Sequence, residues 1–335
     1  MNIGIVNDMP LAVEAMRRTI ARRPEHRVLW VATDGAQAVD FCAAQPPDVV
    51  LMDLIMPRFD GVEATRRIMA SSHPCAILVV TSSVGANAWR VYEAMGAGAL
   101  DAVDTPTLTS GTDAEGNHPL LTKIDQIGRL LEKPTASKPR VVAPVSGGAA
   151  PLVAIGASAG GPTALATVLG KLTAEFPAGI AVVQHVDQAF AAGMAEWLDG
   201  QTALKVRVAV EGDRPRAGEV LLAATNDHMH VLPGGTFGYT REPAATPYRP
   251  SVDVFFHSLV EHWQGTAIGV LLTGMGRDGA IGLKAMRAKG YHTIAQDEAT
   301  SAVYGMPKAA AALDAARAIL PLGRIADELT VLVRK

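Results

Sequence analysis

Short apolar runs alternate with amphipathic helical patterns along most of the chain, and this alternation restricts its fold more than any other feature. Each run has the length of a buried strand, and the segments between runs repeat apolar residues at helical spacing. Repeated strand–helix units form parallel sheets with helices on both faces. The sequence therefore predicts an α/β protein, with strands at residues 3–6, 28–32, 49–52, 76–80 and 100–103, and again at 152–156, 180–183, 206–210, 220–224, 267–272 and 293–295.

A segment rich in proline, glycine and other small residues interrupts the alternation at residues 134–150, as is typical of a linker. We expect a first domain over residues 1–122 with a doubly wound five-stranded parallel sheet, then a closing helix and linker over 123–150. A second α/β domain with a mainly parallel sheet is expected over 151–335, with a β-rich insertion near 206–240. The helices predicted in this domain lie at residues 163–171, 191–198, 252–263, 280–288 and 307–314.

The composition argues against several classes of protein. Hydrophobic residues make up 49% of the chain, which excludes an intrinsically disordered protein. The 30 Lys and Arg residues against 33 Asp and Glu residues give a net charge of −3, without the basic excess that nucleic-acid binding requires. Prolines interrupt the uncharged stretch at 141–170, which argues against a membrane-spanning helix. With only Cys42 and Cys75 and no signal-like start, we expect a cytoplasmic protein with reduced thiols and no direct membrane insertion.

Polar side chains follow three predicted strands of the amino-terminal half. Asn7 and Asp8 come after the first strand, Asp53 ends the third, and Thr81 ends the fourth. Because the carboxyl ends of parallel strands meet at one edge of a sheet, these side chains are expected to converge. Each residue alone is compatible with an ordinary helix cap or turn. Together, the two carboxylates predict a site for Mg²⁺.

This half resembles the receiver domain of response regulators over residues 1–122. The resemblance implies that a histidine kinase transfers a phosphoryl group to Asp53, that Mg²⁺ held by Asp8 and Asp53 assists, and that Thr81 acts in the switch. The matching motifs are Val-Asn-Asp-Met at 6–9, Val-Leu-Met-Asp-Leu-Ile-Met-Pro at 50–57, Asp-Gly at 60–61, Val-Val-Thr-Ser at 79–82 and Gly-Ala-Gly-Ala-Leu-Asp-Ala-Val-Asp-Thr-Pro at 96–106.

Two residues depart from the receiver pattern. Asn7 stands where a second acid is usual, which removes a negative charge from the expected metal site. Thr105 stands where a lysine is usual, and a lysine there would form a charge-assisted hydrogen bond with the phosphoryl group. Asn7, Thr81 and Thr105 are therefore the expected switch positions, and a phosphate-independent receiver is the alternative.

In the carboxyl-terminal half, a serine, a histidine and an aspartate each follow a predicted strand. Ser158 lies in the segment Gly-Ala-Ser-Ala-Gly-Gly-Pro at 156–162, which follows a strand and opens a helix. The glycines allow a sharp turn that exposes the hydroxyl, and proline suits the first helical position. His185 and Asp278 follow two further strands, so the three residues can form a nucleophile, a base and an orienting acid at one sheet edge.

Other interpretations exist for the serine turn and for the histidines. A lone Gly-x-Ser-x-Gly segment is often only a tight turn or a phosphate loop. His228 and His230 are spaced like metal ligands, but no acid or cysteine stands at helical spacing from them, so a strand hairpin is predicted. His257 and His262 are predicted to be structural residues of a helix. The chain order Ser, His, Asp differs from that of α/β-hydrolases, which disfavours a lipase or esterase of that fold.

The carboxyl-terminal half resembles the catalytic domain of the chemotaxis protein-glutamate methylesterases, the CheB family, over residues 151–335. The resemblance implies that Ser158, His185 and Asp278 form a catalytic triad. It also places Ala159, Gly160 and Met275 in the pocket and its oxyanion site. The matching motifs are Ile-Gly-Ala-Ser-Ala-Gly-Gly-Pro at 155–162, Val-Gln-His at 183–185, Tyr-Arg-Pro-Ser-Val-Asp at 248–253, Leu-Thr-Gly-Met-Gly-Arg-Asp-Gly at 272–279 and Tyr-Gly-Met-Pro at 304–307.

The two resemblances together imply a function. They predict a phosphorylation-gated serine hydrolase that removes methyl groups from glutamate methyl esters of methyl-accepting chemoreceptors, with glutamine deamidation as a side activity. The segments at 7–10 and 101–106 look most like the methylesterases of Wsp-type surface-sensing systems. A non-catalytic adaptor with a degenerate receiver is the alternative. A DNA-binding response regulator is disfavoured because the second half has neither a helix-turn-helix pattern nor a basic patch.

Overall fold

The chain divides into two compact units, residues 1–133 and 134–335, which are described separately. The predicted linker at 134–150 lies outside the described residues. Within the described ranges, no helix combines the length and the apolar character that crossing a membrane requires. The structure, a computed structural model, describes residues 1–57, 59–81, 88–107, 118–131 and 151–334.

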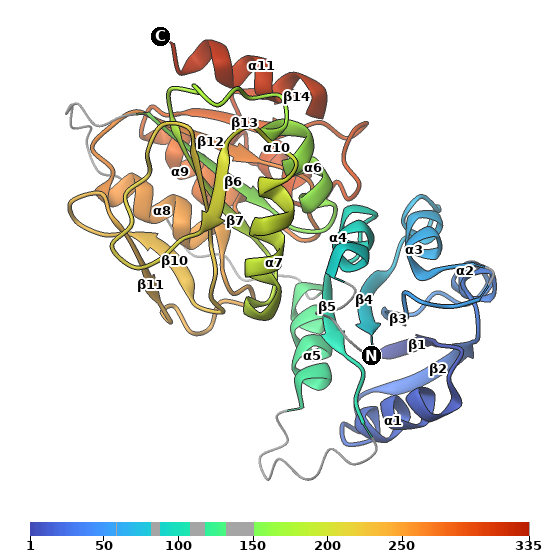
Figure 1. Cartoon of the computed structure of the whole chain (residues 1–335). Helices are drawn as coiled ribbons and strands as arrows, with labels where there is room; N and C mark the ends of the chain where they lie inside the picture. Colours follow the sequence, from blue (N-terminus) through green and yellow to red (C-terminus); the bar gives the residue numbers. More distant parts are fainter. Residues whose placement is uncertain (58, 82–87, 108–117, 132–150, 335) are drawn as a thin grey trace. The chain divides into compact units, whose positions relative to one another are not determined.

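The first unit contains a five-stranded parallel sheet, as the sequence predicts (Figure 1). Its elements are β1 (Asn2–Val6), α1 (Pro10–Ile20), β2 (Arg27–Ala32), α2 (Gly35–Ala44), β3 (Val49–Met52), α3 (Gly61–Met69), β4 (Ala76–Thr81), α4 (Ala88–Gly96), β5 (Asp101–Asp104) and α5 (Pro119–Leu131). The strands lie in the order β2-β1-β3-β4-β5, so the winding direction reverses between β1 and β3. Helices α2, α3 and α4 cover one face of this sheet, and α1 and α5 cover the other.

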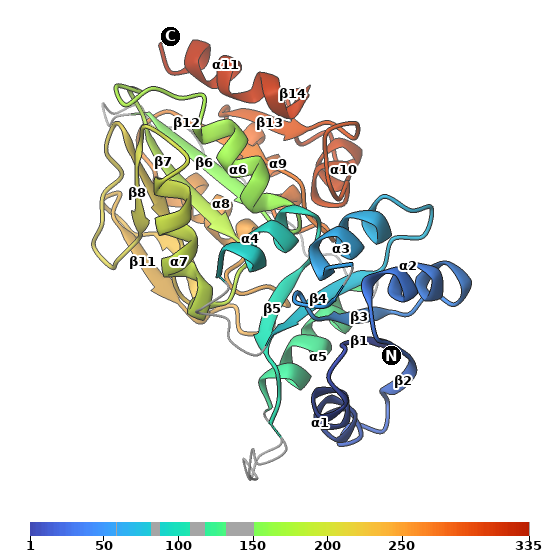
Figure 2. The same ribbon diagram turned by 45° about the vertical axis from the view of Figure 1, so that its right-hand side comes forward.

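The second unit contains a seven-stranded parallel sheet in the order β14-β13-β12-β6-β7-β9-β8. Its first elements are β6 (Leu152–Ala157), α6 (Gly161–Leu169), β7 (Gly179–Gln184), α7 (Gln188–Asp199), β8 (Lys205–Val208), β9 (Glu219–Leu222), β10 (His228–Val231) and β11 (Phe237–Thr240). The chain continues with α8 (Val252–His262), β12 (Ala267–Leu271), α9 (Ala280–Ala288), β13 (His292–Gln296), α10 (Met306–Ala312), β14 (Ala318–Leu320) and α11 (Leu322–Leu332). Figure 2 shows α6 and α7 on one side of the sheet and α8 and α9 on the other.

The predicted β-rich insertion near residues 206–240 is wrong in part. Strands β8 and β9 continue the main parallel sheet at its edge, and only β10 and β11 form a separate antiparallel hairpin. Because β8 is a partly exposed edge strand, its short pattern does not reveal the direction in which it pairs. Strand β14 and helix α11 are absent from the sequence prediction. The strand has only three residues, which is too short to show a periodic pattern.

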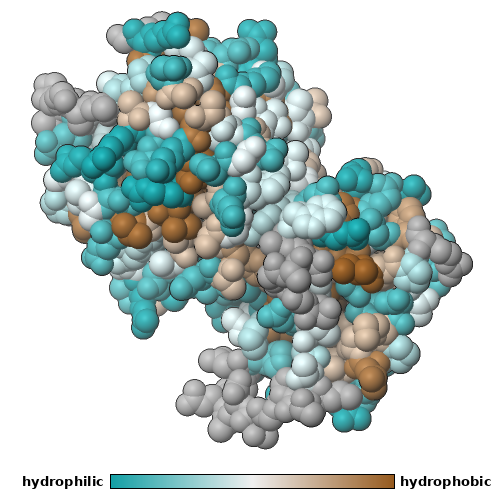
Figure 3. All heavy atoms as spheres, in the orientation of Figure 1, coloured by the Kyte–Doolittle hydropathy of each residue, from teal (hydrophilic) through white to brown (hydrophobic). Residues whose placement is uncertain are grey.

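Strands β6, β7 and β12 form the centre of the larger sheet, and every residue in them is buried. Because helices cover both faces of the sheet, these strands carry continuous apolar runs. Phe237, Phe255 and Phe256 fill the core between the sheet, the hairpin and α8. On the face that Figure 3 shows, hydrophilic side chains predominate. The rigid centre of the sheet therefore holds the loops that follow β6, β7 and β12.

Candidate active site and phosphorylation site

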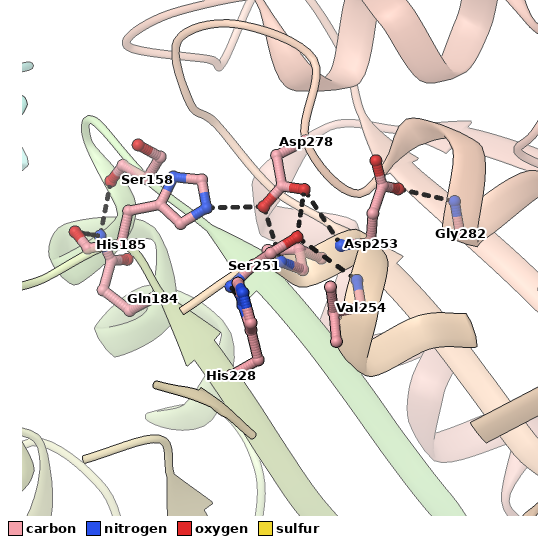
Figure 4. Close-up of polar contacts among 10 residues, drawn as sticks. Ser158, Gln184, His185, His228, Ser251, Asp253, Val254, Asp278 and Gly282 are labelled. Carbon is pink, nitrogen blue, oxygen red and sulfur yellow. Dashed lines mark hydrogen bonds and ion pairs between the residues drawn. The ribbon is translucent and has the colours of Figure 1, made fainter. Parts of the chain in front are cut away.

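The three predicted catalytic residues lie at the carboxyl ends of three neighbouring strands. Ser158 follows β6, His185 follows β7, and Asp278 lies in the loop after β12. The sheet continues from β6 toward β7 on one side and toward β12 on the other, so this edge is the switch point at which open α/β sheets bind ligands. The structure brings the three residues together (Figure 4), and their catalytic role remains a prediction.

The turn that carries Ser158 is held by the loop after β12. The N–H of Ser158 donates to the carbonyl of Thr273 at 3.1 Å, and the Thr273 hydroxyl donates to the carbonyl of Ala159 at 2.9 Å. Gly160 has a φ of 78°, and a Cβ there would lie 2.5 Å from the Cβ of Ala302. Only glycine fits a position that is both left-handed and this crowded. Helix α6 therefore begins at Gly161, directly after the Gly160 turn.

The His185 imidazole is oriented by Asp278. Its Nε2 lies 2.8 Å from Oδ2 of Asp278. Because a carboxylate oxygen only accepts, Nε2 carries the hydrogen and Nδ1 keeps its lone pair. Nδ1 is buried and has no hydrogen-bond partner among the described residues. Figure 4 shows His185 between Asp278 and Ser158, with Nδ1 on the serine side, so the ring can take a proton from a group that approaches Nδ1.

Asp278 accepts hydrogen bonds from four donors. Besides His185, they are the hydroxyl of Ser251 at 2.8 Å and the N–H groups of Val252 at 2.6 Å and Asp253 at 3.1 Å. These N–H groups open helix α8, whose positive end faces the carboxylate. Burial acts to raise the pKa of Asp278, but the His185 ring and the other donors outweigh it and lower the pKa. Asp278 is therefore a fixed anion that orients the imidazole.

Asp253 repeats this arrangement at the next helix. It lies in the first turn of α8, and its Oδ1 accepts the N–H of Gly282, in the first turn of α9, at 2.6 Å. Asp278 precedes α9 and binds the start of α8, so the two carboxylates each bind the start of the other's helix. Burial, followed by the charge of Asp278, raises the pKa of Asp253 to about 8.

The raised pKa of Asp253 predicts how stability depends on pH. The folded protein releases this proton near pH 8, whereas the unfolded chain releases it near pH ~3.9. Between these values the folded state binds more protons, so this group makes the free energy of unfolding fall as the pH rises. Asp253→Asn removes the titration. We expect its stability relative to the unsubstituted protein to increase from about pH 5 to about pH 8, as measured by urea unfolding. If the free energy of unfolding differed between the two proteins by the same amount at both pH values, this prediction would be contradicted.

Gln184 connects the serine turn and the histidine turn, a role that the sequence did not predict. This buried residue ends β7, and its Nε2 donates to the carbonyl of Ser158 at 2.9 Å and to that of His185 at 3.1 Å. A glutamine at the end of a buried strand, next to a candidate base, is the sequence signal that could have identified this role. Ser251 was missed as well, although a serine directly before a predicted helix is a typical N-cap.

The predicted oxyanion positions lie beside Ser158. The N–H groups of Ala159 and Gly160 precede α6 and donate to no acceptor among the described residues. Within the same ranges, the N–H of Met275 also has no acceptor. Its neighbour Gly274 packs against the serine, because a Cβ on Gly274 would lie 2.8 Å from the Cβ of Ser158. N–H groups placed in this way can stabilise a developing negative charge, and that role remains a prediction.

Four histidines outside the predicted triad lie in the elements that the sequence predicts for them. His228 and His230 belong to β10 of an antiparallel hairpin, and His257 and His262 belong to α8. Nδ1 of His228 accepts the N–H of Ser251 at 3.1 Å, so this ring supports the residue that caps α8. Burial lowers the pKa of His228, which favours the neutral form that can accept.

In the first unit, the predicted switch residues lie at or just after strand ends and form two contacts, one of Asn7 with Asp53 and one of Thr105 with Thr81. The Asn7 amide donates to Oδ2 of Asp53 at 3.0 Å, and its oxygen accepts the N–H of Met9 at 2.8 Å. The N–H of Thr105 donates to the carbonyl of Thr81 at 2.9 Å. Asp53 follows β3 and Asn7 follows β1, so both lie at the edge where the winding direction reverses.

The electrostatics of Asp53 fit a bound cation. Burial raises the pKa of Asp53 to about 6, and the charge of the exposed Asp8 adds to this effect. The carboxylate accepts hydrogen bonds from neutral groups, the Asn7 amide and the N–H of Ile55. Hard oxygen ligands and an uncompensated buried negative charge suit Mg²⁺. Asn7 is neutral, and its amide nitrogen donates to Asp53, so it offers no carboxylate to an ion. The acidic ligands would therefore be Asp8 and Asp53.

The fold and the two sites define a class of protein: a response-regulator receiver joined to a parallel-sheet α/β domain with a serine, a histidine and an aspartate at its switch point. Comparison with family models agrees for both parts. Residues 3–109 match the response regulator receiver domain, and residues 153–329 match the CheB methylesterase. The chain therefore belongs to the CheB methylesterase family.

Several relatives are similar over both units. The chain is 75% identical to protein-glutamate methylesterase/protein-glutamine glutaminase 2 of Burkholderia orbicola (strain AU 1054), over 334 residues that cover 100% of each chain. It is also 72% identical to protein-glutamate methylesterase/protein-glutamine glutaminase 4 of Burkholderia thailandensis. That alignment of 337 residues covers 100% of this chain and 98% of the relative. The crystal structure of the Thermotoga maritima CheB methylesterase catalytic domain matches with a TM-score of 0.52 and 34% identity, over 54% of this chain and 97% of that chain.

Proposed function

We propose that this protein is a phosphorylation-gated serine hydrolase that removes methyl groups from glutamate methyl esters of methyl-accepting chemoreceptors. The observation that carries the proposal is the contact between Nε2 of His185 and Asp278, which leaves Nδ1 on the side of Ser158. Relatives that match the full chain are named for this activity. The segments at 7–10 and 101–106 support a place in a Wsp-type signalling system, and membership of the CheB family supports a cytoplasmic location.

In the first half-reaction, the Ser158 hydroxyl attacks the carbonyl carbon of the ester while its proton moves to Nδ1 of His185. Asp278 stabilises the imidazolium that forms. The N–H groups at the start of α6 and that of Met275 bind the oxyanion, and each such donor lowers the barrier by about 2.7–4 kcal/mol. When the tetrahedral intermediate collapses, His185 returns the proton to the departing methoxide, and methanol leaves.

In the second half-reaction, water attacks the acyl-enzyme. His185 takes a proton from the water and then gives it to the Ser158 oxygen as the acyl bond breaks. The products are the free serine and a glutamate side chain, whose carboxylic acid releases the second water proton to solvent and leaves as the carboxylate. The same steps on a glutamine amide release ammonia in place of methanol, which accounts for a glutaminase side activity.

The receiver supplies the gate. Asp53 accepts a phosphoryl group from a histidine kinase, and Asp8 and Asp53 would hold Mg²⁺. When bound, the ion would neutralise charge on the transferring phosphoryl group. Thr81, which contacts Thr105 through its backbone, would respond to the phosphoryl group. The contact between the Asn7 amide and Asp53 supports a receiver that operates with one acid fewer than usual.

Methanol release from receptor membranes that carry radioactive methyl esters tests the function. The full chain is assayed with and without acetyl phosphate and Mg²⁺, and Asp53→Asn is the matched control. We expect release in both conditions, an increase with the phosphodonor, and no increase in the control. Equal methanol release with and without the phosphodonor would contradict control by phosphorylation but would leave the hydrolase activity supported. The absence of release in every condition would overturn the enzyme and favour the adaptor.

A further inference from the structure

The aromatic ring of Tyr248 lies flat against the imidazole of His185. The two ring centroids are 4.5 Å apart, and the ring planes differ by 18°. Aromatic rings in such contact attract each other, and the attraction grows when one ring carries a positive charge. Asp278 binds one edge of the imidazole, and Tyr248 covers one of its faces. The two contacts together restrict both the direction and the plane of the ring.

The Tyr248 hydroxyl reaches the loop after β12. A Cβ on Gly276 would lie 1.9 Å from the hydroxyl oxygen, so that oxygen lies directly against the backbone of this loop. Gly276 has a φ of 80°, so this position requires glycine both for its backbone and for the space that the tyrosine fills. Gly276 directly follows Met275, whose N–H is one of the proposed oxyanion donors. Tyr248 therefore contacts both the proposed base and the loop of the proposed oxyanion site.

The segment that presents Tyr248 also supports the acid. Ser251, three residues further on, donates its hydroxyl to Asp278 at 2.8 Å. Burial raises the pKa of Tyr248, with the charge of Asp278 adding to it, so the hydroxyl stays protonated. The short stretch at 248–251 thus contacts the base through a ring and the acid through a hydroxyl. Because both contacts come from one stretch of backbone, they position the two groups relative to each other.

We infer that Tyr248 is a positioning residue for the hydrolase, which holds the His185 ring in the plane that directs Nδ1 at Ser158. The inference rests on the proposed roles of Ser158, His185 and Asp278. Without the stacked ring, the imidazole can turn about its hydrogen bond to Asp278, and Nδ1 then leaves the direction of the serine. In the attack step the stacked face also stabilises the imidazolium and keeps water from that side.

A set of substitutions separates the ring from the hydroxyl. Tyr248→Phe keeps the ring and removes the hydroxyl, whereas Tyr248→Leu removes the ring and keeps an apolar side chain. Tyr248→Met is a second non-aromatic variant in case the leucine variant does not fold. Each is made in the full chain, checked by thermal unfolding, and assayed for kcat and KM on the methyl-labelled receptor membranes. Ser158→Ala is assayed in parallel.

We expect kcat to fall about tenfold in the non-aromatic variants and to stay within about threefold in Tyr248→Phe, with KM nearly unchanged in all of them. A second readout is the downfield NMR signal of the Nε2 hydrogen of His185 in ¹⁵N-histidine-labelled protein. It should persist in Tyr248→Phe and broaden in Tyr248→Leu, because water gains access to the exposed ring face. If Tyr248 only contributed to stability, the substitutions would lower the unfolding temperature, and Tyr248→Phe and Tyr248→Leu would have the same kcat.

The outcomes distinguish the inference from the function on which it rests. If Ser158→Ala is inactive and the leucine and methionine variants keep full kcat, the positioning role is overturned and the triad stands. A rise in KM with unchanged kcat would also overturn it, since Tyr248 would then act in substrate binding. If Ser158→Ala keeps full activity, the triad fails and the inference fails with it.

Discussion

Replacing Ser158 by alanine is expected to lower kcat for methyl ester hydrolysis by on the order of 10⁶-fold, the scale seen when a serine hydrolase loses its nucleophile. The reason is that no other hydroxyl occupies the end of β6, where the turn between Ser158 and α6 faces Nδ1 of His185. The fold should be retained. Within the described residues, the hydrogen bonds of Ser158 all involve its backbone N–H and carbonyl, so removal of the hydroxyl leaves no group unsatisfied.

Methanol release and thermal unfolding measure these two expectations on the same preparation. Phosphorylation of Asp53 by acetyl phosphate is the control, because the first unit is untouched and the variant should be phosphorylated like the unsubstituted protein. Turnover at the unsubstituted rate would contradict the assignment of Ser158 as nucleophile. A large loss of unfolding temperature would mean that the activity result reports on folding.

Asp278→Asn is expected to lower kcat by about 10⁴-fold, because the amide can favour the wrong tautomer of His185. Oδ2 of Asp278 accepts from Nε2 of His185 at 2.8 Å, and the asparagine NH₂ placed there would donate to the ring in its stead. Nε2 would then keep the lone pair, and Nδ1 would carry the hydrogen. The base would be protonated on the atom that faces the serine.

The same substitution should also destabilise the second unit. The carboxylate accepts from four donors, and an amide offers only one acceptor oxygen, so at least one buried donor loses its partner. We expect a loss of about 1–3 kcal/mol in the free energy of unfolding. Ser251→Ala is the matched control, since it removes one donor and keeps the anion. A kcat in Asp278→Asn no lower than in Ser251→Ala would contradict the orienting role of Asp278.

The three residues of the candidate triad were predictable because each follows a strand that the sequence reveals. Ser158, His185 and Asp278 were identified as residues that follow buried apolar runs, and parallel strands place such residues at one edge whatever the details of packing. Asn7 and Asp53 were expected to meet for the same reason, and they form a hydrogen bond. Such a prediction requires only the positions of the strands, and the local pattern of apolar residues supplies them.

The supporting residues were not predictable in the same way. Gln184, Tyr248 and Ser251 contribute through contacts with loops that are distant in the sequence. The place of β8 and β9 in the main sheet was missed for a related reason, because β8 is an edge strand with one neighbour and a weak pattern. Neither kind of contact leaves a periodic signal in a single sequence.

The sequence by itself determined that this chain has two α/β units and which polar residues end their strands, because apolar periodicity and strand length are local properties. Only the tertiary structure decided which nitrogen of His185 faces Asp278, and that Asp278 binds the start of α8 while Asp253 binds the start of α9. It also decided that Tyr248 stacks on the imidazole. These features depend on strand order and on loops that cross between distant strands, and the packing of the whole unit fixes both.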